Sequence, residues 1–434
     1  MSAAESLDIE PISGPLDAVV VLPGSKSITN RALVCAGLAA GDSVLNGALR
    51  ADDTEAMVDG LVALGVQVTA DWANDRIAVT GCSGHPGGDV AMIDARMSGT
   101  TSRFLLPLAA LGEGIRRVDG ALRLRERPME PALAALRTLG ASVREVGAPG
   151  HLPVEVEGGS LRGGVVAMAG DVSSQFLSGL LLAGPAMPDG LEVRLLGDLV
   201  SRPYADMTVA VMSAFEAAVA HPDDDLWTIS PQRYRGTDYT IEPDASAASY
   251  AFAAAAIVGG RVQVDGLGSA SLQGDLAFVD LLRQMGATVE RTATHTTVTG
   301  TGRLHGIEAD LAQISDTAQT LAVVAAFADG PTRVTGIGFI RGKETDRVRA
   351  VVTELRRAGI QAEEEADGFV VRPGVVQPAQ IETYDDHRMA MAFALLGARA
   401  PGITISDPGC VSKTFPGYWG MLDGLRHPGR VLPS

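Results

Sequence analysis

Apolar and polar positions follow one pattern that recurs along the chain: an apolar helix, a glycine, a short strand, a turn and a second strand. Clear copies occupy residues 61–81, 136–159, 282–302 and 355–374. In each copy the apolar residues change from a helical spacing to the alternation of a half-buried strand. The pattern therefore predicts an α/β protein built from similar units.

The glycines that end these helices give the length of one unit. Gly65 and Gly140 lie 75 residues apart (140 − 65), and Gly286 and Gly359 lie 73 apart (359 − 286). A period of this length is too long for common solenoid repeats and indicates a larger α/β unit. An ordinary doubly wound α/β protein with accidental spacing remains an alternative at this point.

The remaining length accommodates two further units. Residues 212–231 form a degenerate copy in the gap, and residues 421–429 resemble the end of a sixth. Six units, three in each half, then account for the chain. The polar, turn-rich stretch around residues 235–244 is the expected boundary between the halves.

Composition favours a globular protein outside the membrane. The chain has 434 residues, of which 46% are hydrophobic, enough for two or three domains with buried cores. Its longest apolar stretches are interrupted before the roughly 18 residues that a membrane span needs. The acidic start, residues 1–11, lacks the basic and apolar segments of an export signal. We therefore expect a cytoplasmic protein, and a monomer.

Charge and cysteine content exclude other classes. Cys35, Cys82 and Cys410 are an odd number without CxxC spacing, which argues against disulfides and thiolate metal sites. The seven histidines form no pair with metal-ligand spacing, so neither a metal nor another cofactor is expected. A net charge of -17 argues against nucleic acid as a partner. An anionic substrate would need a local basic pocket.

Several apolar helices are preceded by short polar clusters. Ser, Thr and Asp in such clusters are ordinary N-cap residues, and capping alone can explain any single cluster. The clusters are residues 23–31, 97–103, 171–175, 342–347 and 384–388.

Cations also occur at these helix starts, where the helix dipole disfavours positive charge by roughly 0.3–1 kcal/mol each. A bound phosphate or carboxylate would offset this cost, because it accepts hydrogen bonds from the free backbone N–H groups and from the cation. We expect these cations to line one anion-binding cleft between the halves. They are Lys26, Arg31, Arg103, Lys343, Arg347 and Arg388.

The lysines support the same hypothesis. Lys26, Lys343 and Lys413 are the only lysines among the 35 basic residues, and each lies in a polar motif. Lysine carries a compact ammonium that can release its proton, unlike arginine. Chance placement in an arginine-rich chain is the alternative. The GSKS segment, residues 24–27, is not a phosphate-binding P-loop, which requires GxxxxGK[ST].

Two acids are candidates for proton transfer. Asp316 and Glu344 each stand at an expected helix start beside polar and cationic residues. Either one can be a simple cap, but in a shared anion site both would suit general acid or base catalysis. His387, between Asp386 and Arg388, is a candidate proton relay or phosphate ligand.

Nine motifs, in order, resemble the family of 3-phosphoshikimate 1-carboxyvinyltransferase, also called enolpyruvylshikimate-phosphate synthase. The resemblance extends from about residue 10 to residue 425. The motifs are PGSKSITNR, SGTTSR, RERP, SSQFLSGLLLA, SRPY, EPDASAASY, GKETDR, YDDHRMAM and KTFPGYW.

The resemblance implies a fold and a reaction. The fold has two domains of three βαβαββ units each, an inside-out α/β barrel arrangement, that close on the substrates. Residues 24–242 would form the first domain, and residues 1–23 with 243–434 the second. The reaction transfers the enolpyruvyl group of phosphoenolpyruvate to the 5-hydroxyl of shikimate 3-phosphate and releases phosphate, in aromatic amino acid biosynthesis.

The resemblance also implies residue roles. Asp316 would be the base for the hydroxyl, Glu344 with Lys26 the acid, and Lys413 a charge stabiliser, while Thr100, Asp386 and His387 would support the site. Shikimate 3-phosphate would bind Lys26, Ser27, Arg31, Ser173, Ser174, Gln175, Ser201, Tyr204, Asp316 and Lys343. Phosphoenolpyruvate would bind Lys26, Gly99, Arg127, Gln175, Arg347, Arg388 and Lys413.

Two positions depart from the family pattern, and two other functions are alternatives. Many relatives have Asn where this chain has Met97 and Phe339, so single polar contacts can differ. One alternative is the related transferase that uses UDP-N-acetylglucosamine, but the GSKS start and the cysteine-free stretch 114–128 disfavour it. The other is a non-catalytic anion-binding homologue. The resemblance also predicts inhibition by glyphosate, because it places Gly99, which has no Cβ, against the phosphoenolpyruvate pocket.

Overall fold

The computed structural model describes residues 6–88, 92–427 and 431–432. Within it the chain forms two compact units, one of residues 24–242 and one that joins residues 1–23 to residues 243–434. The expected absence of an export signal rests partly on residues 1–5, and the expected sixth unit includes residues 428–429; both segments lie outside the described residues.

In the described part of the 24–242 unit, the strands form three four-stranded sheets. Strands joined through a helix are parallel, and the hairpin that completes each sheet is antiparallel. One sheet contains β3 (Asp42–Asn46), β4 (Gln67–Asp71), β5 (Arg76–Thr80) and β14 (Asp238–Thr240). The second contains β6 (Met92–Asp94), β7 (Ile115–Asp119), β8 (Val143–Glu145) and β9 (Val154–Glu157), and the third β10 (Gly164–Ala169), β11 (Leu191–Leu196), β12 (Ala220–Asp223) and β13 (Leu226–Ile229).

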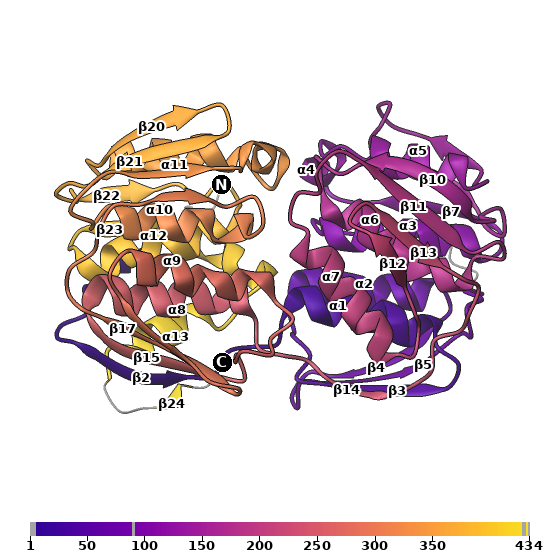
Figure 1. The fold of residues 1–434 in the computed structure, drawn as a ribbon, viewed down its shortest axis with the longest axis horizontal. Helices are drawn as coiled ribbons and strands as arrows, with labels where there is room; N and C mark the ends of the chain where they lie inside the picture. Colours follow the sequence, from indigo (N-terminus) through magenta and orange to yellow (C-terminus); the bar gives the residue numbers. More distant parts are fainter. Residues whose placement is uncertain (1–5, 89–91, 428–430, 433–434) are drawn as a thin grey trace. The chain divides into compact units, whose positions relative to one another are not determined.

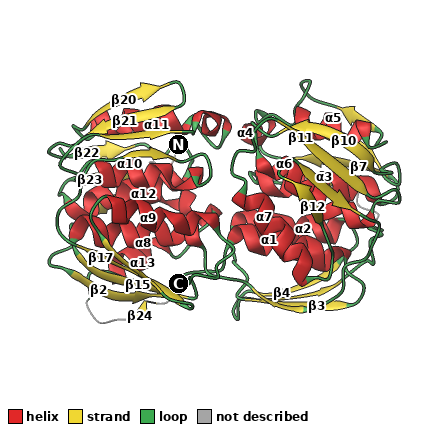
Figure 2. Cartoon of the chain, viewed as in Figure 1, coloured by secondary structure: helices red, strands yellow, loops and turns green. Residues whose placement is uncertain are grey.

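This unit's helices lie inside its sheets, apart from the short and largely exposed α4 (Figure 2). They are α1 (Lys26–Leu38), α2 (Asp52–Ala63), α3 (Gly99–Leu111), α4 (Leu122–Arg125), α5 (Glu130–Thr138), α6 (Ser174–Ala183), the short 3-10 helix η1 (Gly184–Ala186) and α7 (Pro203–Ala214).

The described strands of the other unit, which includes β1 and β2 from the N-terminal segment, form three sheets of three, five and four strands. In Figure 1 its helices lie between β20 to β23 on one side and β2, β15 and β17 on the other. Its strands are β1 (Ser6–Ile9), β2 (Leu16–Val20), β15 (Gly260–Asp265), β16 (Thr288–Arg291), β17 (His295–Gly300), β18 (Glu308–Asp310), β19 (Thr332–Thr335), β20 (Gln361–Glu365), β21 (Gly368–Arg372), β22 (Ala379–Ile381), β23 (Ile403–Ser406) and β24 (Val431–Leu432). Its helices are α8 (Ala245–Val258), η2 (Gly274–Ala277), α9 (Phe278–Gln284), η3 (Ser315–Thr317), α10 (Ala318–Ala325), η4 (Gly338–Gly342), α11 (Arg347–Arg357), α12 (His387–Arg399), η5 (Pro408–Lys413) and α13 (Tyr418–Gly424).

One sheet of each unit takes a strand from a distant segment. In the 24–242 unit β14 pairs in parallel with β3, so that Tyr239 faces Leu45. In the other unit β2 pairs in parallel with β15, and Val20 faces Val264. β1 also adds antiparallel to β23. These pairings hold the two N-terminal strands in the unit of residues 243–434.

The central helices are buried on all sides, because sheets and other helices cover them. Every residue of α12 from His387 to Ala398 is buried, and the same holds for α3 from Gly99 to Ala110. Such all-round burial is typical of helices in the core of a large domain. The α/β fold class predicted from the sequence is confirmed, with helices inside and sheets outside.

The predicted repeat is visible in how its helices end. After α2, α5, α9 and α11 the glycines Gly65, Gly140, Gly286 and Gly359 adopt φ between 80° and 109°. Each donates its N–H three residues back, and the following residue donates five residues back, which is the Schellman motif. In the degenerate copy Glu216 takes the same position with φ 61°. The Schellman motif therefore recurs in the degenerate copy, although a glutamate replaces the glycine there.

Candidate active site

Lys26 is the first residue of α1, at a point where the chain passes very close to a neighbouring loop. A Cβ at Gly24 would lie 1.8 Å from the carbonyl oxygen of Gly47, so only glycine fits there. The Lys26 Nζ atom lies 3.0 Å from Oδ2 of Asp53, in the first turn of α2. The Thr101 hydroxyl in turn donates to the Asp53 carbonyl at 3.2 Å. The starts of α1, α2 and α3 are therefore linked around this lysine.

Arg31 lies one turn further along α1, where it is buried. Its guanidinium donates to the Thr208 hydroxyl at 2.7 Å, the Ser178 hydroxyl at 3.3 Å and the carbonyls of Ser27 and Tyr204 at 2.9 and 3.0 Å. Burial lowers the pKa of Arg31 to about 10, so the group stays charged at neutral pH. The acceptors that hold this charge are hydroxyls and carbonyls, which bring Ser27 and Tyr204 beside it.

Gly99 and Arg127 lie against each other at the start of α3. A Cβ added to Gly99 would come within 2.9 Å of the Arg127 guanidinium. Ser98 caps the helix, since its hydroxyl accepts from the Thr101 N–H at 3.1 Å. The absence of a side chain at Gly99 therefore makes room for the Arg127 cation at the dipole-positive end of α3.

Gln175 joins the starts of α3 and α6. Its amide donates to the Thr100 hydroxyl at 3.1 Å, and its carbonyl accepts from Arg103 at 2.6 Å. Ser173 caps α6 by accepting from the Gln175 N–H at 3.3 Å, and Ser174 is buried in the first turn. The structure thus brings together candidate residues from two motifs that lie more than seventy positions apart.

Ser201 is held in an unusual backbone conformation just before α7. Its φ is 54°, in the left-handed region that residues other than glycine seldom adopt. The residue is buried, and Tyr204 follows in the first turn of α7. Backbone strain of this kind is frequent at functional sites and persists only where the surroundings enforce it.

Arg347 is the centre of a carboxylate network in the other unit. It donates to Asp386 at 2.7 Å, Asp316 at 3.1 Å and Glu344 at 2.8 Å. Burial disfavours its charge, but Asp386, Glu344 and Asp316 outweigh this effect and raise its pKa. Arg347 therefore fixes the positions of both candidate catalytic acids.

Two further cations complete this network. Arg388 donates to Asp316 at 2.7 Å, and the Lys413 Nζ atom lies 4.0 Å from Oε1 of Glu344. All of these residues are largely buried, with Asp316 the most exposed at 20% of its side chain. In this unit the chain's own carboxylates lie beside the cations of the helix starts.

His387 and Lys343 lie at the edges of the network. The buried His387 has Nδ1 3.6 Å from the carboxylate of Asp386, which caps α12 through the Arg388 N–H at 3.0 Å. The Lys343 ammonium lies 5.9 Å from the ring centre of Phe339, a cation–π distance. The aromatic residue that departs from the family pattern thus contacts a candidate substrate ligand.

Comparisons with known proteins agree with this arrangement. The family model described as EPSP synthase (3-phosphoshikimate 1-carboxyvinyltransferase) matches residues 11–422. A protein named 3-phosphoshikimate 1-carboxyvinyltransferase from Nostoc punctiforme is 45% identical over 96% of this chain and 98% of its own length. The chain belongs to the EPSP synthase family.

More distant members show the same relationship. The chloroplastic 3-phosphoshikimate 1-carboxyvinyltransferase of Arabidopsis thaliana is 40% identical over 97% of this chain and 85% of its own length. The solved structure of EPSP synthase from Acinetobacter baumannii superposes with a TM-score of 0.81 at 26% identity, covering 96% of this chain and 97% of that one. The membership expected from the nine sequence motifs is confirmed.

Some contacts of this EPSP synthase family member were not found from its sequence. Asp53, the partner of Lys26, stands among the acids that begin α2 and resembles an ordinary first-turn acid. Thr208 contacts the candidate ligand Arg31 as well. Only the pairing of helix starts in space distinguishes these residues from caps and surface charges.

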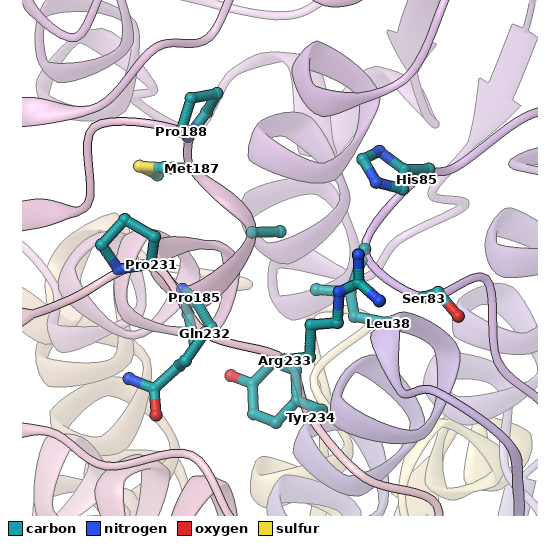
Figure 3. A pocket seen from close by; sticks show the side chains of 12 residues that line it. Leu38, Ser83, His85, Pro185, Met187, Pro188, Pro231, Gln232, Arg233 and Tyr234 are labelled. Carbon is teal, nitrogen blue, oxygen red and sulfur yellow. The ribbon is translucent and has the colours of Figure 1, made fainter.

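The described residues contain neither a helix that is long and apolar enough to cross a bilayer nor a group of three His, Cys, Asp or Glu that could hold a metal. They do contain a separate cavity of about 410 Å³ in the 24–242 unit (Figure 3). It lies where α1 ends at Leu38 and beyond the end of α6, at Pro185 and Met187. Helix C-termini carry the negative end of the dipole, so this cavity lies away from the dipole-positive starts of the same helices.

Proposed function

We propose that this EPSP synthase family member transfers the enolpyruvyl group of phosphoenolpyruvate to the 5-hydroxyl of shikimate 3-phosphate and releases inorganic phosphate. The main support is the 45% identity to a protein of that name over nearly the whole of both chains. The grouped lysines, arginines and carboxylates described above are the residue types that this reaction requires. Metal ions and organic cofactors have no part in the proposed scheme.

The residues of the 24–242 unit supply mostly neutral hydrogen-bond donors and positive charge. Serine hydroxyls, a glutamine amide and helix N-termini suit a phosphate ester with free hydroxyl groups. We assign shikimate 3-phosphate to Lys26, Ser27, Arg31, Ser173, Ser174, Gln175, Ser201 and Tyr204 of this unit, together with Asp316 and Lys343.

Phosphoenolpyruvate carries a phosphate and a carboxylate, which both need cations. Arginine binds such groups through two parallel hydrogen bonds, and lysine acts as a point charge. We assign phosphoenolpyruvate to Lys26, Gly99, Arg127, Gln175, Arg347, Arg388 and Lys413, with Thr100, Asp386 and His387 in support.

The reaction needs one acid and one base. An acid protonates the methylene carbon of phosphoenolpyruvate, so that the adjacent carbon becomes electrophilic. The 5-hydroxyl oxygen attacks that carbon while the base takes its proton, which gives a tetrahedral intermediate. Phosphate then leaves with the C–O bonding electrons, and the new methyl group returns a proton to restore the double bond.

Asp316 and Glu344 fit these two roles because Arg347 contacts both, at 3.1 and 2.8 Å. A substrate carboxylate that competes for Arg347 would loosen both acids at the moment of binding. We assign Asp316 as the base for the hydroxyl and Glu344, with Lys26, as the acid that later reverses its role. Lys413, 4.0 Å from Glu344, would stabilise charge on the phosphate during the sequence.

The test is phosphate release from a mixture of the protein, phosphoenolpyruvate and shikimate 3-phosphate, with and without a chelator. Release that needs both substrates and is unaffected by the chelator is the expected result. Phosphate release with UDP-N-acetylglucosamine instead of shikimate 3-phosphate would show that the protein has the activity of the related transferase. No release with either acceptor would leave a non-catalytic homologue. The cytoplasmic location, the monomeric state and glyphosate inhibition stay predictions.

A further inference from the structure

A strained turn leads into α12. Tyr384 and Asp385 have φ of 57° and 56°, and the Asp386 N–H donates to the Thr383 carbonyl at 2.9 Å. Two successive left-handed residues inside such a turn are normally glycine or asparagine, because other side chains crowd the backbone. A tyrosine at the first of these positions therefore needs something that holds it.

The turn determines where three site residues lie. Asp386, its last residue, caps α12 and accepts from Arg347 Nε at 2.7 Å. Arg388, two residues later, reaches Asp316 at 2.7 Å. A change in the turn would therefore move the Asp386 carboxylate and, with it, both arginines.

Glu354 holds this turn from the side of α11. It is completely buried, seven residues after Arg347 on the same helix. Its Oε1 accepts from the Tyr384 hydroxyl at 2.6 Å, and its Oε2 accepts from the Glu382 N–H at 3.0 Å. Arg357, with Nε 3.3 Å from Oε2, balances the buried charge. α11 is thus tied to the segment 382–386 at two points, through Glu354 and through Arg347.

The Tyr384 hydroxyl remains a donor at neutral pH. Burial, and then its hydrogen bond to the Glu354 carboxylate, raise the pKa of Tyr384 to about 12. Hydrogen bonds to a charged acceptor are the stronger kind. The contact is therefore suited to hold a backbone conformation that the local sequence disfavours.

We propose that Glu354 and Tyr384 are positioning residues for phosphoenolpyruvate binding: their hydrogen bond holds the strained 383–386 turn, which orients Arg347 and Arg388. This inference rests on the proposed function, which assigns phosphoenolpyruvate to those two arginines. Neither Glu354 nor Tyr384 belongs to the assigned substrate ligands. Their effect on the substrate acts through Asp386.

Tyr384→Phe tests the proposal because it removes only the hydroxyl. We expect the KM for phosphoenolpyruvate to rise at least about fivefold, and by a larger factor than kcat falls, because the arginines that bind the substrate are the residues displaced. Tyr234→Phe is the matched control, since it removes a hydroxyl that donates to the Leu182 carbonyl at 3.0 Å in the other unit. Unchanged KM in Tyr384→Phe, or the same KM increase in Tyr234→Phe, would overturn the proposal.

Glu354→Gln provides a second variant. The amide keeps one acceptor oxygen, so it can accept from Tyr384 or from Glu382 but not from both in the present geometry. The KM for phosphoenolpyruvate should rise in the same direction as in Tyr384→Phe. A lower kcat at constant KM would instead make Glu354 part of the proton-transfer machinery and contradict a positioning role.

Hydrogen exchange separates this inference from the proposed function. In Tyr384→Phe the amides of Asp386 to Arg388 should exchange at least about tenfold faster than in the wild type, whether or not the protein turns over. If exchange is faster in Tyr384→Phe but the wild type releases no phosphate, the proposed function is rejected. The role of the Tyr384 hydroxyl in the turn would still be supported. Unchanged exchange would reject the role of Tyr384 even in an active enzyme.

Discussion

Arg31 and Arg347 are both completely buried near the start of a helix, but their surroundings differ. Arg31 is held by the hydroxyls of Thr208 and Ser178 and by two carbonyls, and burial lowers its pKa. Arg347 is held by three carboxylates, and they raise its pKa despite burial. Only neutral acceptors therefore contact Arg31 in the hydrogen bonds described for it, whereas acids balance the charge of Arg347.

The helix caps follow the same division. In the 24–242 unit α3 and α6 are capped by Ser98 and Ser173, which are neutral. In the other unit Asp244, Asp346 and Asp386 cap α8, α11 and α12. An aspartate offsets the helix dipole, but a serine leaves it available to a ligand. The dipoles of α3 and α6 are therefore less compensated by their caps than those of α8, α11 and α12.

The largest expected effect is on stability. Arg347→Met removes the cation shared by Asp386, Glu344 and Asp316, of which the first two are buried, and should lower the free energy of unfolding by about 3–5 kcal/mol. Arg31→Met leaves only neutral acceptors without their donor and should lower the free energy of unfolding by about 1–3 kcal/mol. Urea titrations of both variants measure the difference. Equal losses would show that the two arginines are held alike.

The pH dependence sharpens this test. In Arg347→Met, protonation of the carboxyls removes their mutual repulsion. The loss in free energy of unfolding relative to the wild type should therefore become smaller as the pH falls from about 7 to about 4. The deficit of Arg31→Met should stay constant over the same range, because no carboxylate contacts that residue among the hydrogen bonds described for it.

The second largest effect is on turnover. Asp316→Ala and Lys413→Met should each lower kcat by at least about 10², the usual contribution of a general acid, base or charge stabiliser. Asp329→Ala, which removes a surface carboxylate paired with His305 and Arg303, is the control in the same unit. Near-normal turnover in either site variant, with circular dichroism unchanged, would remove that residue from catalysis.

A third effect concerns the start of α3 in the 24–242 unit. Gly99→Ala puts a methyl group 2.9 Å from the Arg127 guanidinium, which must move. The KM for phosphoenolpyruvate should rise about tenfold, which is about 1.4 kcal/mol, and inhibition by glyphosate should weaken. Gly420→Ala is the control, because a Cβ there meets nothing within 4 Å. Unchanged inhibition would contradict the placement of Gly99 beside phosphoenolpyruvate.

The smallest effect tests the caps directly. Ser173→Asp keeps a capping oxygen but adds a negative charge at the start of α6, so the KM for shikimate 3-phosphate should rise several-fold at low salt and less at high salt. Ser173→Ala, which removes the cap without adding charge, should change the salt dependence little. If both variants behave alike, the neutrality of the cap has no role in binding.

Local patterns in the sequence predicted much of this molecule. Helices begin at or beside the expected polar clusters, as at Lys26, Gly99 and Ser174, because capping is a property of a few neighbouring residues. The repeat was found from glycines that need a left-handed φ, and the degenerate copy was found from spacing although Glu216 replaces the glycine.

Contacts between distant segments could not be predicted from these patterns. Asp53 pairs with Lys26 from the start of another helix, and three carboxylates from separate motifs converge on Arg347. Charge spacing along the chain does not show which cation meets which acid in space. Anion binding by the helix-start cations stays a prediction.

The pairing of β2 with β15, which are far apart in the sequence, has a consequence for synthesis on the ribosome. β2 emerges early, but its parallel partner β15 begins at Gly260, so roughly 240 residues must be translated before the two can pair. At about 5–20 residues per second this takes on the order of tens of seconds. During that interval the nascent β2 exposes an unpaired, partly apolar edge, and the chain between β2 and β15 can complete its own sheets first.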